Sequence, residues 1–313
     1  MASDDPSRPG RPGPGRRAQP GVSPPAPGPI RLVVSDLDGT LLRDDLTVSE
    51  RVRAALRLTR AQGVPIILAS GRMYRSVVPW ACELGLDGPA ICYQGAYVRE
   101  LPPACPDPTA TTAAPAGALL LHRPLAIPVA RAAIRWCEGH GLGPHANIDD
   151  ELVMAHGDEN AADYERASGV EARFLPDLAA GLLKPPTKIL AVGPAGRPEA
   201  LLEEARARFA GRAQVTVSHP EYLEFTAPGV TKGWAVRWLA RRLGIPLESV
   251  MALGDQYNDL EMLEAVGQGV AMGGAPEPVR HAARYVTGTV GEDGAAQALE
   301  ALVLGRGSPE VRA

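Results

Sequence analysis

The chain has 313 residues, 45% of them hydrophobic and 22% charged, which is typical of a globular protein of about two domains and not of a disordered chain. Its 32 basic and 36 acidic residues give a net charge of −4, so a protein that binds nucleic acid through a basic surface is not expected. No stretch approaches the roughly 18 apolar residues of a membrane-spanning helix, so we do not expect a membrane as partner either.

The first 29 residues differ in composition from the rest of the chain. They are mostly Pro, Gly, Ser, Ala and Arg and offer too few apolar side chains to offset the entropy lost on ordering. We therefore expect residues 1–29 to form a disordered tail. Residues 306–313 are expected to form a short C-terminal tail. Arg16 and Arg17 are not followed by the apolar stretch of an export signal, so we do not expect a leader.

The four cysteines show neither a metal-binding nor a redox spacing; they are Cys82, Cys92, Cys105 and Cys137. In a chain of this length we expect all four to be buried or unreactive thiols in a reducing compartment, which favours a cytoplasmic protein. The sequence leaves open whether several copies assemble into a homo-oligomer.

Strands and helices alternate in both outer parts of the chain. The apolar run 30–34 is typical of a strand buried on both faces of a parallel sheet, and further strands are expected at 64–69, 90–93, 250–253 and 269–272. Helices are expected at 74–84, 235–243, 259–266 and 295–304. Another helix opens at a capping box formed by Thr47 and Glu50 and ends at Gly63. This alternation predicts a Rossmann-like α/β fold with a doubly wound parallel sheet.

The middle of the chain has a different pattern of expected strands and helices. Strand-like segments at 118–122, 152–155, 187–192 and 213–218 are mixed with helical segments at 128–138 and 199–210. We interpret residues 98–222 as an α+β domain inserted into a discontinuous core, which comprises residues 30–97 and 223–305. Five prolines make 101–117 a predicted loop or linker.

The first chemical signal directly follows the first expected strand and consists of Asp36, Leu37, Asp38, Gly39 and Thr40. Carboxylates two residues apart on a loop at the carboxyl end of a strand point into the crevice where α/β sheets bind ligands. One carboxylate can attack while the other transfers protons, and together they can hold a hard divalent cation. An isolated pair of this kind is more often a solvated acidic turn, but the whole run after a strand is far rarer.

Two further signals, each weak alone, follow along the chain. Ser70 and Gly71 come at the end of the second expected strand, where a hydroxyl and a backbone N–H can both donate to a phosphate oxygen. The alternative is an ordinary strand-to-helix cap. Lys232 lies at a helix start after the insertion, where it would place a positive charge beside carboxylates and phosphate. The alternative is a surface lysine.

A last polar cluster follows the strand expected at 250–253. Asp255, Asn258 and Asp259 place three polar groups within five residues at the carboxyl end of this strand, which is common in metal sites. A helix N-cap by Asn258 or Asp259 is the alternative, and both roles are compatible.

In this order, the four segments resemble the four motifs of the haloacid dehalogenase superfamily of phosphohydrolases. Asp36 to Thr40 is similar to the first motif, Ser70 to the second and Lys232 to the third. Gly254 and Asp255 with Asn258 and Asp259 are similar to the fourth. Other segments resemble its Cof-type branch, whose large α/β cap is inserted between the second and third motifs; they are 93–96, 224–225, 270–273 and 292–294. The chain departs from the branch at Gln94 and Gly274, where Asn is usual, and 101–117 looks like an extra insertion near the core–cap junction.

The resemblance implies a Mg²⁺-dependent phosphatase that acts on a small phosphorylated metabolite of the sugar phosphate, FMN or pyridoxal phosphate type. Mg²⁺ would be held by Asp36, by the backbone carbonyl of Asp38 and by Asp255. Asp36 would attack phosphorus to form an aspartyl-phosphate, and Asp38 would act as general acid and base. The implied phosphate-binding residues are Leu37, Ser70, Gly71, Lys232 and Asn258. Asp259 would orient water or phosphate from outside the metal's own ligands.

The sequence is also compatible with two other functions. A phosphotransferase or mutase would use the same intermediate but pass the group to a second hydroxyl. A non-catalytic metabolite-binding protein could retain the fold, although all four motifs are intact. The cap should set specificity, and its candidates for contact with the leaving group are Asn147, Asp149, Asp150 and Glu151, unless these form only a solvated acidic turn.

Overall fold

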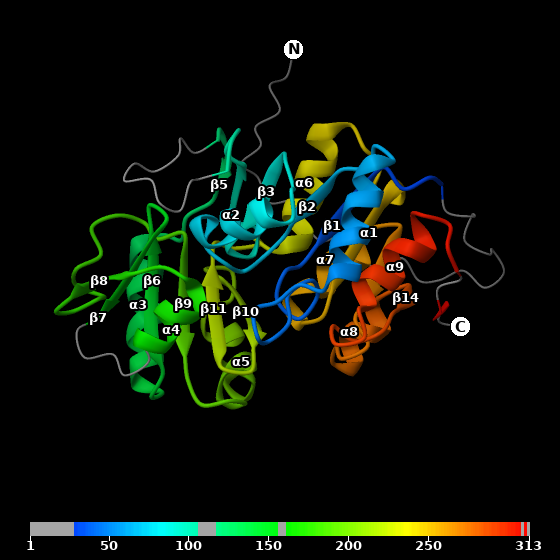
Figure 1. Cartoon of the computed structure of the whole chain (residues 1–313). Helices are drawn as coiled ribbons and strands as arrows, with labels where there is room; N and C mark the ends of the chain where they lie inside the picture. Colours follow the sequence, from blue (N-terminus) through cyan, green and yellow to red (C-terminus); the bar gives the residue numbers. More distant parts are fainter. Residues whose placement is uncertain (1–27, 106–116, 156–160, 308–309, 312–313) are drawn as a thin grey trace, which may run out of the picture.

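The structure of the protein, a computed structural model, describes residues 28–105, 117–155, 161–307 and 310–311 (Figure 1). Most of the predicted tail 1–29, most of the predicted loop 101–117 and part of 306–313 lie outside these residues. Within the described parts of the chain, no helix is both long and apolar enough to cross a bilayer.

The core is built on a six-stranded sheet in the order β15–β14–β13–β12–β1–β2. Neighbouring strands from β2 to β14 are parallel, and β15 joins the edge in the antiparallel sense. Its strands are β1 (Leu32–Ser35), β2 (Ile66–Leu68), β12 (Val250–Gly254), β13 (Gln268–Ala271), β14 (Tyr285–Val286) and β15 (Glu310–Val311). The predicted parallel α/β core is therefore confirmed.

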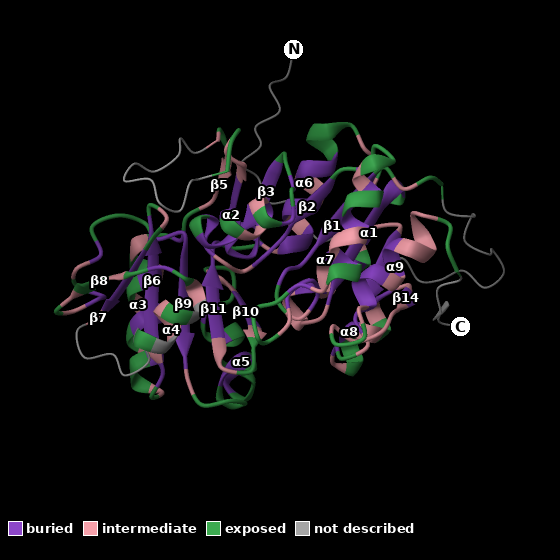
Figure 2. Ribbon diagram, in the orientation of Figure 1, coloured by how far each residue is buried: buried purple, intermediate pink, exposed green. Residues whose placement is uncertain are grey.

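Helices cover both faces of this sheet (Figure 1). Side chains of β1 alternate between the two faces, so Val33 packs with α1 (Glu50–Ala61) and α9 (Gly294–Leu302), whereas Val34 packs with α6 (Lys232–Leu243). The remaining helices of the core are α2 (Tyr74–Glu83), α7 (Leu260–Ala265) and α8 (Glu277–Ala282), with the short helical turns η2 (Leu247–Ser249) and η3 (Tyr257–Asp259). Figure 2 shows the central strands of this sheet as buried and the outer helix faces as exposed.

The start of α1 differs from the prediction. Its N-cap is Ser49, whose Oγ accepts a hydrogen bond of 3.1 Å from the backbone N–H of Val52. Thr47 instead donates its hydroxyl to Asp45 in the preceding turn, at 2.5 Å. Serine and threonine both supply a capping oxygen, so the spacing alone placed the helix start too early. The predicted end is confirmed by Gly63, which has φ +79° and donates to the carbonyl of Arg60.

A small antiparallel sheet adjoins the core and comprises β3 (Pro89–Cys92), β4 (Tyr97–Glu100) and β5 (Leu119–His122). A helical turn, η1 (Tyr93–Gly95), joins its first two strands. We expected 118–122 within the insertion, but this strand pairs with β4 and not with the sheet of the inserted domain. The local pattern predicted the strand and could not identify its partner.

The cap is a second six-stranded sheet in the order β10–β11–β9–β6–β7–β8. Its strands are β6 (Gly143–Ile148), β7 (Glu151–Ala155), β8 (Ala172–Leu175), β9 (Lys188–Val192), β10 (Gln214–His219) and β11 (Tyr222–Thr226). Its helices are α3 (Ile127–Gly139), α4 (Ala161–Ser168) and α5 (Arg197–Arg208). The edge formed by β10 and β11 lies toward the core (Figure 1). Strands β6, β8 and β11 were not predicted. In β6 the polar residues His145 and Asn147 interrupt the apolar pattern, although both are buried.

The cysteines differ from the prediction at one pair. Cys82 at the end of α2 and Cys105 after β4 form a disulfide, so the expectation of four free thiols was wrong for these two. Their separation of 23 residues matches no motif, and only the folded chain brings them together. Cys92 and Cys137 are free and buried, as expected.

Candidate active site

The first predicted carboxylate lies directly at the carboxyl end of β1. Asp36 is 5% exposed, and its backbone N–H donates to the carbonyl of Leu253 at the neighbouring strand end. Asp38 lies two residues further on and is exposed. Gly39 has φ +71°, and a Cβ at this position would lie 2.3 Å from Oδ2 of Asp255. Glycine therefore permits both the turn and the close approach of Asp255 to this loop.

A buried lysine joins two of the predicted carboxylates. Nζ of Lys232 lies 2.8 Å from Oδ1 of Asp36 and 2.7 Å from Oδ1 of Asp259. The ammonium and the carboxylate of Asp259 are fully buried, which excludes the alternative of a surface lysine. Oδ2 of Asp259 accepts from the backbone N–H groups of Asp255 and Gln256, at 3.0 and 3.1 Å. Asp259 therefore fixes the loop and also holds the lysine in place.

The carboxylates lie close enough to raise one another's pKa. Ligand oxygens of Asp36, Asp255 and Asp259 all lie within 4.8 Å of one another. Burial, followed by the charge of Asp259, raises the pKa of Asp36 well above its usual value despite the opposing effect of Lys232. Burial and Asp259 likewise raise the pKa of Asp255 to about 7. Burial alone would lower the pKa of Lys232, but Asp259 and Asp36 outweigh it and raise that pKa.

Ser70 and Gly71 lie beyond β2, at the same edge of the sheet. Ser70 is fully buried, and its Oγ accepts from the backbone N–H of Arg72 at 3.1 Å. Arg72 forms two hydrogen bonds of 2.7 and 2.8 Å with the carboxylate of Asp38. Sequence reasoning assigned no role to Arg72; its only signal was a basic residue directly after a turn predicted to bind phosphate.

A pocket of about 460 Å³ opens between this edge of the core and the cap. The predicted residues that line it are Asp36, Asp38, Gly71, Asp255 and Asn258. Leu37, Ser70, Lys232 and Asp259 are buried, and none of them lines it. Gly274, one of the two departures from the branch, does not line it either.

The cap contributes a different set of pocket residues from those expected. Pocket-lining cap residues include Tyr164, Lys188, His219, Tyr222 and Glu224. The ring of Tyr222 packs against those of Tyr164 and His219, with centroid distances of 5.7 and 4.9 Å, and forms an aromatic wall. The sequence analysis considered polar residues that follow strands of the core sheet. It missed these residues because they belong to the cap.

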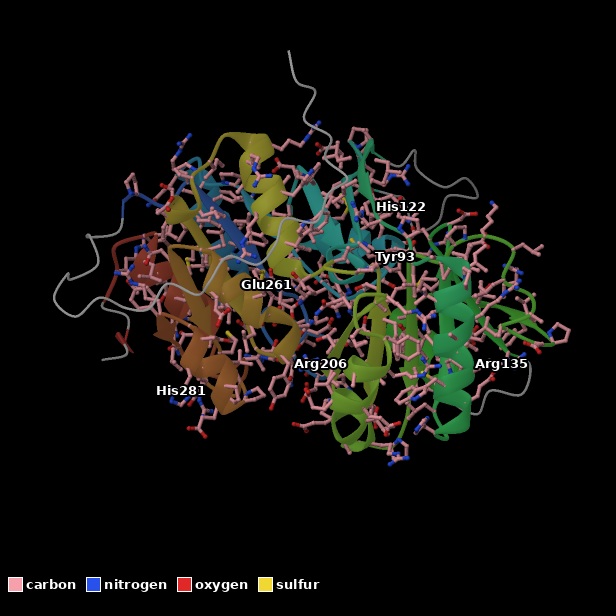
Figure 3. All side chains as sticks on the ribbon, turned by 180° about the vertical axis from the view of Figure 1, so that it is seen from behind. Tyr93, His122, Arg135, Arg206, Glu261 and His281 are labelled. Carbon is pink, nitrogen blue, oxygen red and sulfur yellow. A yellow bond between two sulfur atoms is a disulfide. The ribbon has the colours of Figure 1, made fainter. Side chains whose placement is uncertain are left out.

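The turn between β6 and β7 does not line the pocket, so Asn147, Asp149, Asp150 and Glu151 are not supported as contacts to the leaving group. Asp149 and Asp150 both have positive φ in this turn. Asp150 instead accepts from the hydroxyl of Tyr93 at 2.5 Å, and Asp149 lies 2.6 Å from Nζ of Lys184. Figure 3, seen from behind, places Tyr93 between the core and the cap, so this turn joins the two parts of the molecule.

The sequence profile of the haloacid dehalogenase-like hydrolases matches residues 33–299, most of the chain. The chain belongs to this family. A haloacid dehalogenase-like hydrolase from Bacteroides thetaiotaomicron superposes with a TM-score of 0.72 at 30% identity, over 87% of this chain and 99% of that one.

Two relatives of this haloacid dehalogenase-like chain carry more specific names. The 5-amino-6-(5-phospho-D-ribitylamino)uracil phosphatase YcsE of Bacillus subtilis is 27% identical over 277 residues, or 88% of this chain and 96% of that protein. The pyridoxal phosphate phosphatase YbhA of Escherichia coli is 28% identical over 276 residues, or 85% and 96%. With this coverage, both matches include core and cap.

Proposed function

We propose that the chain is a Mg²⁺-dependent phosphatase of a small phosphorylated metabolite and that it works through an aspartyl-phosphate on Asp36. The observation that carries this proposal is the position of Asp36, whose Oδ1 is held by Lys232 while the residue lines a pocket shared with Asp38 and Asp255. A carboxylate held by one oxygen presents the other to a bound phosphate. The names of the two relatives support a phosphorylated metabolite as the substrate.

Asp38 suits the role of general acid and base. It is exposed at the mouth of the pocket, and the guanidinium of Arg72 fixes its carboxylate through two hydrogen bonds. From there it would protonate the departing alkoxide and later remove a proton from the attacking water. The N–H of Gly71 and the amide of Asn258 would donate to the phosphate oxygens, which share the developing negative charge.

The residues present fit a magnesium ion. The oxygen-only donor set of Asp36 and Asp255 is the kind that Mg²⁺ prefers. Burial, followed by the charge of Asp259, raises the pKa of both carboxyls despite the opposing effect of Lys232, and a bound cation would favour their ionised forms. Both oxygens of Asp259 are already engaged, by Lys232 and by two backbone N–H groups, which supports a place for Asp259 outside the metal's own ligands. The bound ion would polarise the phosphate and neutralise charge.

A phosphate-release screen tests the proposed function. We expect Mg²⁺-dependent release of phosphate from one or more members of a panel of phosphorylated metabolites, complete loss with EDTA, and recovery with added Mg²⁺. Full activity after metal removal would contradict the magnesium assignment. Transfer of the phosphoryl group to an added alcohol in preference to water would favour the phosphotransferase alternative. A cytoplasmic location and the assembly state stay predictions.

In the absence of divalent metal, the free energy of unfolding should fall as the pH rises from about 4 to about 7. The native carboxyl of Asp255, with its pKa near 7, retains a proton that the unfolded chain has lost above the usual value of 3.8. The folded state therefore binds more protons in this window, and its stability decreases as they are lost. Added Mg²⁺ should restore stability above pH 7, since it binds the ionised carboxylate. Thermal unfolding with and without Mg²⁺ measures both effects.

The matched control for this prediction is Asp255→Asn, which cannot titrate at this position. Its stability should depend less on pH between 5 and 8 and should respond little to Mg²⁺. Burial lowers the pKa of His122, which gives a pH dependence of the opposite sign, but this contribution is common to both proteins and cancels in the comparison. Equal pH slopes and equal responses to Mg²⁺ in the two proteins would refute the role of Asp255.

A further inference from the structure

A buried ion pair of the cap reaches the core at the wall of the pocket. Lys188 of β9 and Glu224 of β11 are each 2% exposed, and Nζ lies 2.7 Å from Oε2. Such a pair is weak evidence of a stabilising role, because the loss of hydration offsets much of the attraction between the charges. Lys188 and Glu224 also form hydrogen bonds with residues of the core, and these contacts suggest a role other than stabilisation.

Lys188 holds the turn that follows β2. Its ammonium donates to the carbonyl oxygen of Gly71 at 2.6 Å, across the junction between cap and core. The same peptide unit carries the N–H of Arg72, which donates to Oγ of Ser70. Because a peptide unit is planar, fixing its carbonyl also fixes its N–H. Lys188 therefore fixes the peptide unit that follows Gly71, the residue of this turn that lines the pocket. The N–H of Gly71, proposed to bind phosphate, belongs to the adjoining peptide unit and is held through the shared Cα.

Glu224 holds the opposite loop through one intermediate side chain. Its Oε1 accepts from Nε2 of Gln94 at 3.0 Å, and Oε1 of Gln94 accepts from Nδ2 of Asn258 at 3.0 Å. Gln94 is 2% exposed and lies in the left-handed region at φ +59°, so its position is tightly defined. A Cβ on residue 71 would lie 2.3 Å from Nε2 of Gln94. The side chain that Glu224 holds therefore packs directly against the residue that Lys188 holds.

We propose that Lys188 and Glu224 are positioning residues that couple docking of the cap to the arrangement of Gly71 and Asn258, the two groups expected to bind phosphate. The phosphate site would then be complete only when the cap is in contact with the core. A substrate would meet a fully formed site only after water has been excluded from the pocket. This inference rests on the proposed function for its link to turnover, but the effect on phosphate binding can be measured without turnover.

The first test replaces the charged lysine by an apolar side chain of similar length. We expect Lys188→Met to lower kcat/KM by about 10- to 100-fold, a range typical of groups that orient binding residues. The loss should be the same for acetyl phosphate, whose leaving group is too small to reach far into the cap, as for larger phosphorylated metabolites. Calorimetry should show a similar loss of affinity for inorganic phosphate in the presence of Mg²⁺. Lys184→Met, which removes an exposed cap lysine, is the matched control and should change neither quantity.

The double variant Lys188→Met with Glu224→Leu separates positioning from stability. Removal of both charges leaves no buried charge unpaired, so the melting temperature should return close to that of the wild type even if the single variant folds poorly. Positioning predicts that kcat/KM and phosphate affinity nevertheless stay low. Recovery of both along with stability would overturn the proposal in favour of a merely structural pair. A loss confined to large substrates would overturn it in favour of direct contact with the leaving group.

Failure of the proposed function would give a different result. A wild-type protein that releases phosphate from no substrate, acetyl phosphate included, would reject the phosphatase assignment and leave the calorimetric comparison in place. Weaker binding of inorganic phosphate by the double variant would then still support positioning by Lys188 and Glu224, and equal binding would refute it.

Discussion

Replacing Asp36 by asparagine should reduce turnover by about three to six orders of magnitude, the loss expected when a nucleophile is removed. The amide cannot form the covalent bond to phosphorus, while the backbone position after β1 stays the same. The fold should survive, because burial disfavours the charged form of Asp36, as its raised pKa indicates, and Lys232 retains Asp259 as a partner. Steady-state release of phosphate and a thermal melt measure the two effects.

Asp87→Asn is a suitable control for this variant. Asp87 pairs with Arg60 at the surface with its side chain 77% exposed, so its replacement should change neither rate nor stability noticeably. Retention of even a tenth of the wild-type rate by Asp36→Asn would remove Asp36 from its role. A collapse of the fold would show that the carboxylate is needed for structure, and the rate would then have to be measured on Asp36→Glu, which keeps the charge but misplaces it.

Replacing Lys232 by methionine should destabilise the fold by about 3–5 kcal/mol and abolish activity. The change leaves the carboxylates of Asp36 and Asp259 buried without their shared cation, and breaking a buried pair has a cost of this size. The loss should be smaller at pH 5 than at pH 8. Without the lysine the pKa of Asp36, already raised by burial, rises further, so the native state retains a proton at the lower pH and less buried charge remains unpaired.

Urea unfolding of Lys232→Met at the two pH values, without metal, measures this prediction. Lys184→Met again serves as control, since the surface pair of Lys184 with Asp149 should contribute less than about 1 kcal/mol. An equal loss at both pH values would mean that packing of the lysine stem, and not its charge, stabilises the site. If the free energy of unfolding fell by less than about 1 kcal/mol, the result would contradict a buried ion pair between Lys232 and its two carboxylates.

The sequence predicted the core site because its residues follow a rule of position. Asp36, Ser70 and Asp255 each follow a strand of one parallel sheet, and the carboxyl ends of such strands meet at one edge. Lys232 was predicted from its position at a helix start and not at a strand end, and only the structure shows that Asp36 and Asp259 share it. Local sequence patterns therefore predicted which side chains come together where these side chains directly follow strands of the core sheet.

The cap contacts could not be predicted because they depend on docking between distant parts of the chain. Lys188 lies 117 residues from Gly71, and Glu224 lies 130 residues from Gln94. The one available signal was a charged residue within an otherwise apolar strand, as at Lys188. The acidic turn at Asp149 and Asp150 gave the opposite error, since acidic residues in a turn suggested a binding loop. In the structure Asp150 joins the cap to the core through Tyr93, and Asp149 pairs with Lys184 within the cap.

Chemical trapping of the covalent intermediate tests the central claim most directly. The wild-type protein would be mixed with Mg²⁺ and the best substrate of the panel, quenched within the first turnover, and reduced with borohydride, which converts an aspartyl-phosphate to homoserine. We expect peptide mass spectrometry to find homoserine at position 36 and to find none when substrate is omitted. Turnover without any modification at position 36, or modification at another carboxylate such as Asp255, would contradict it.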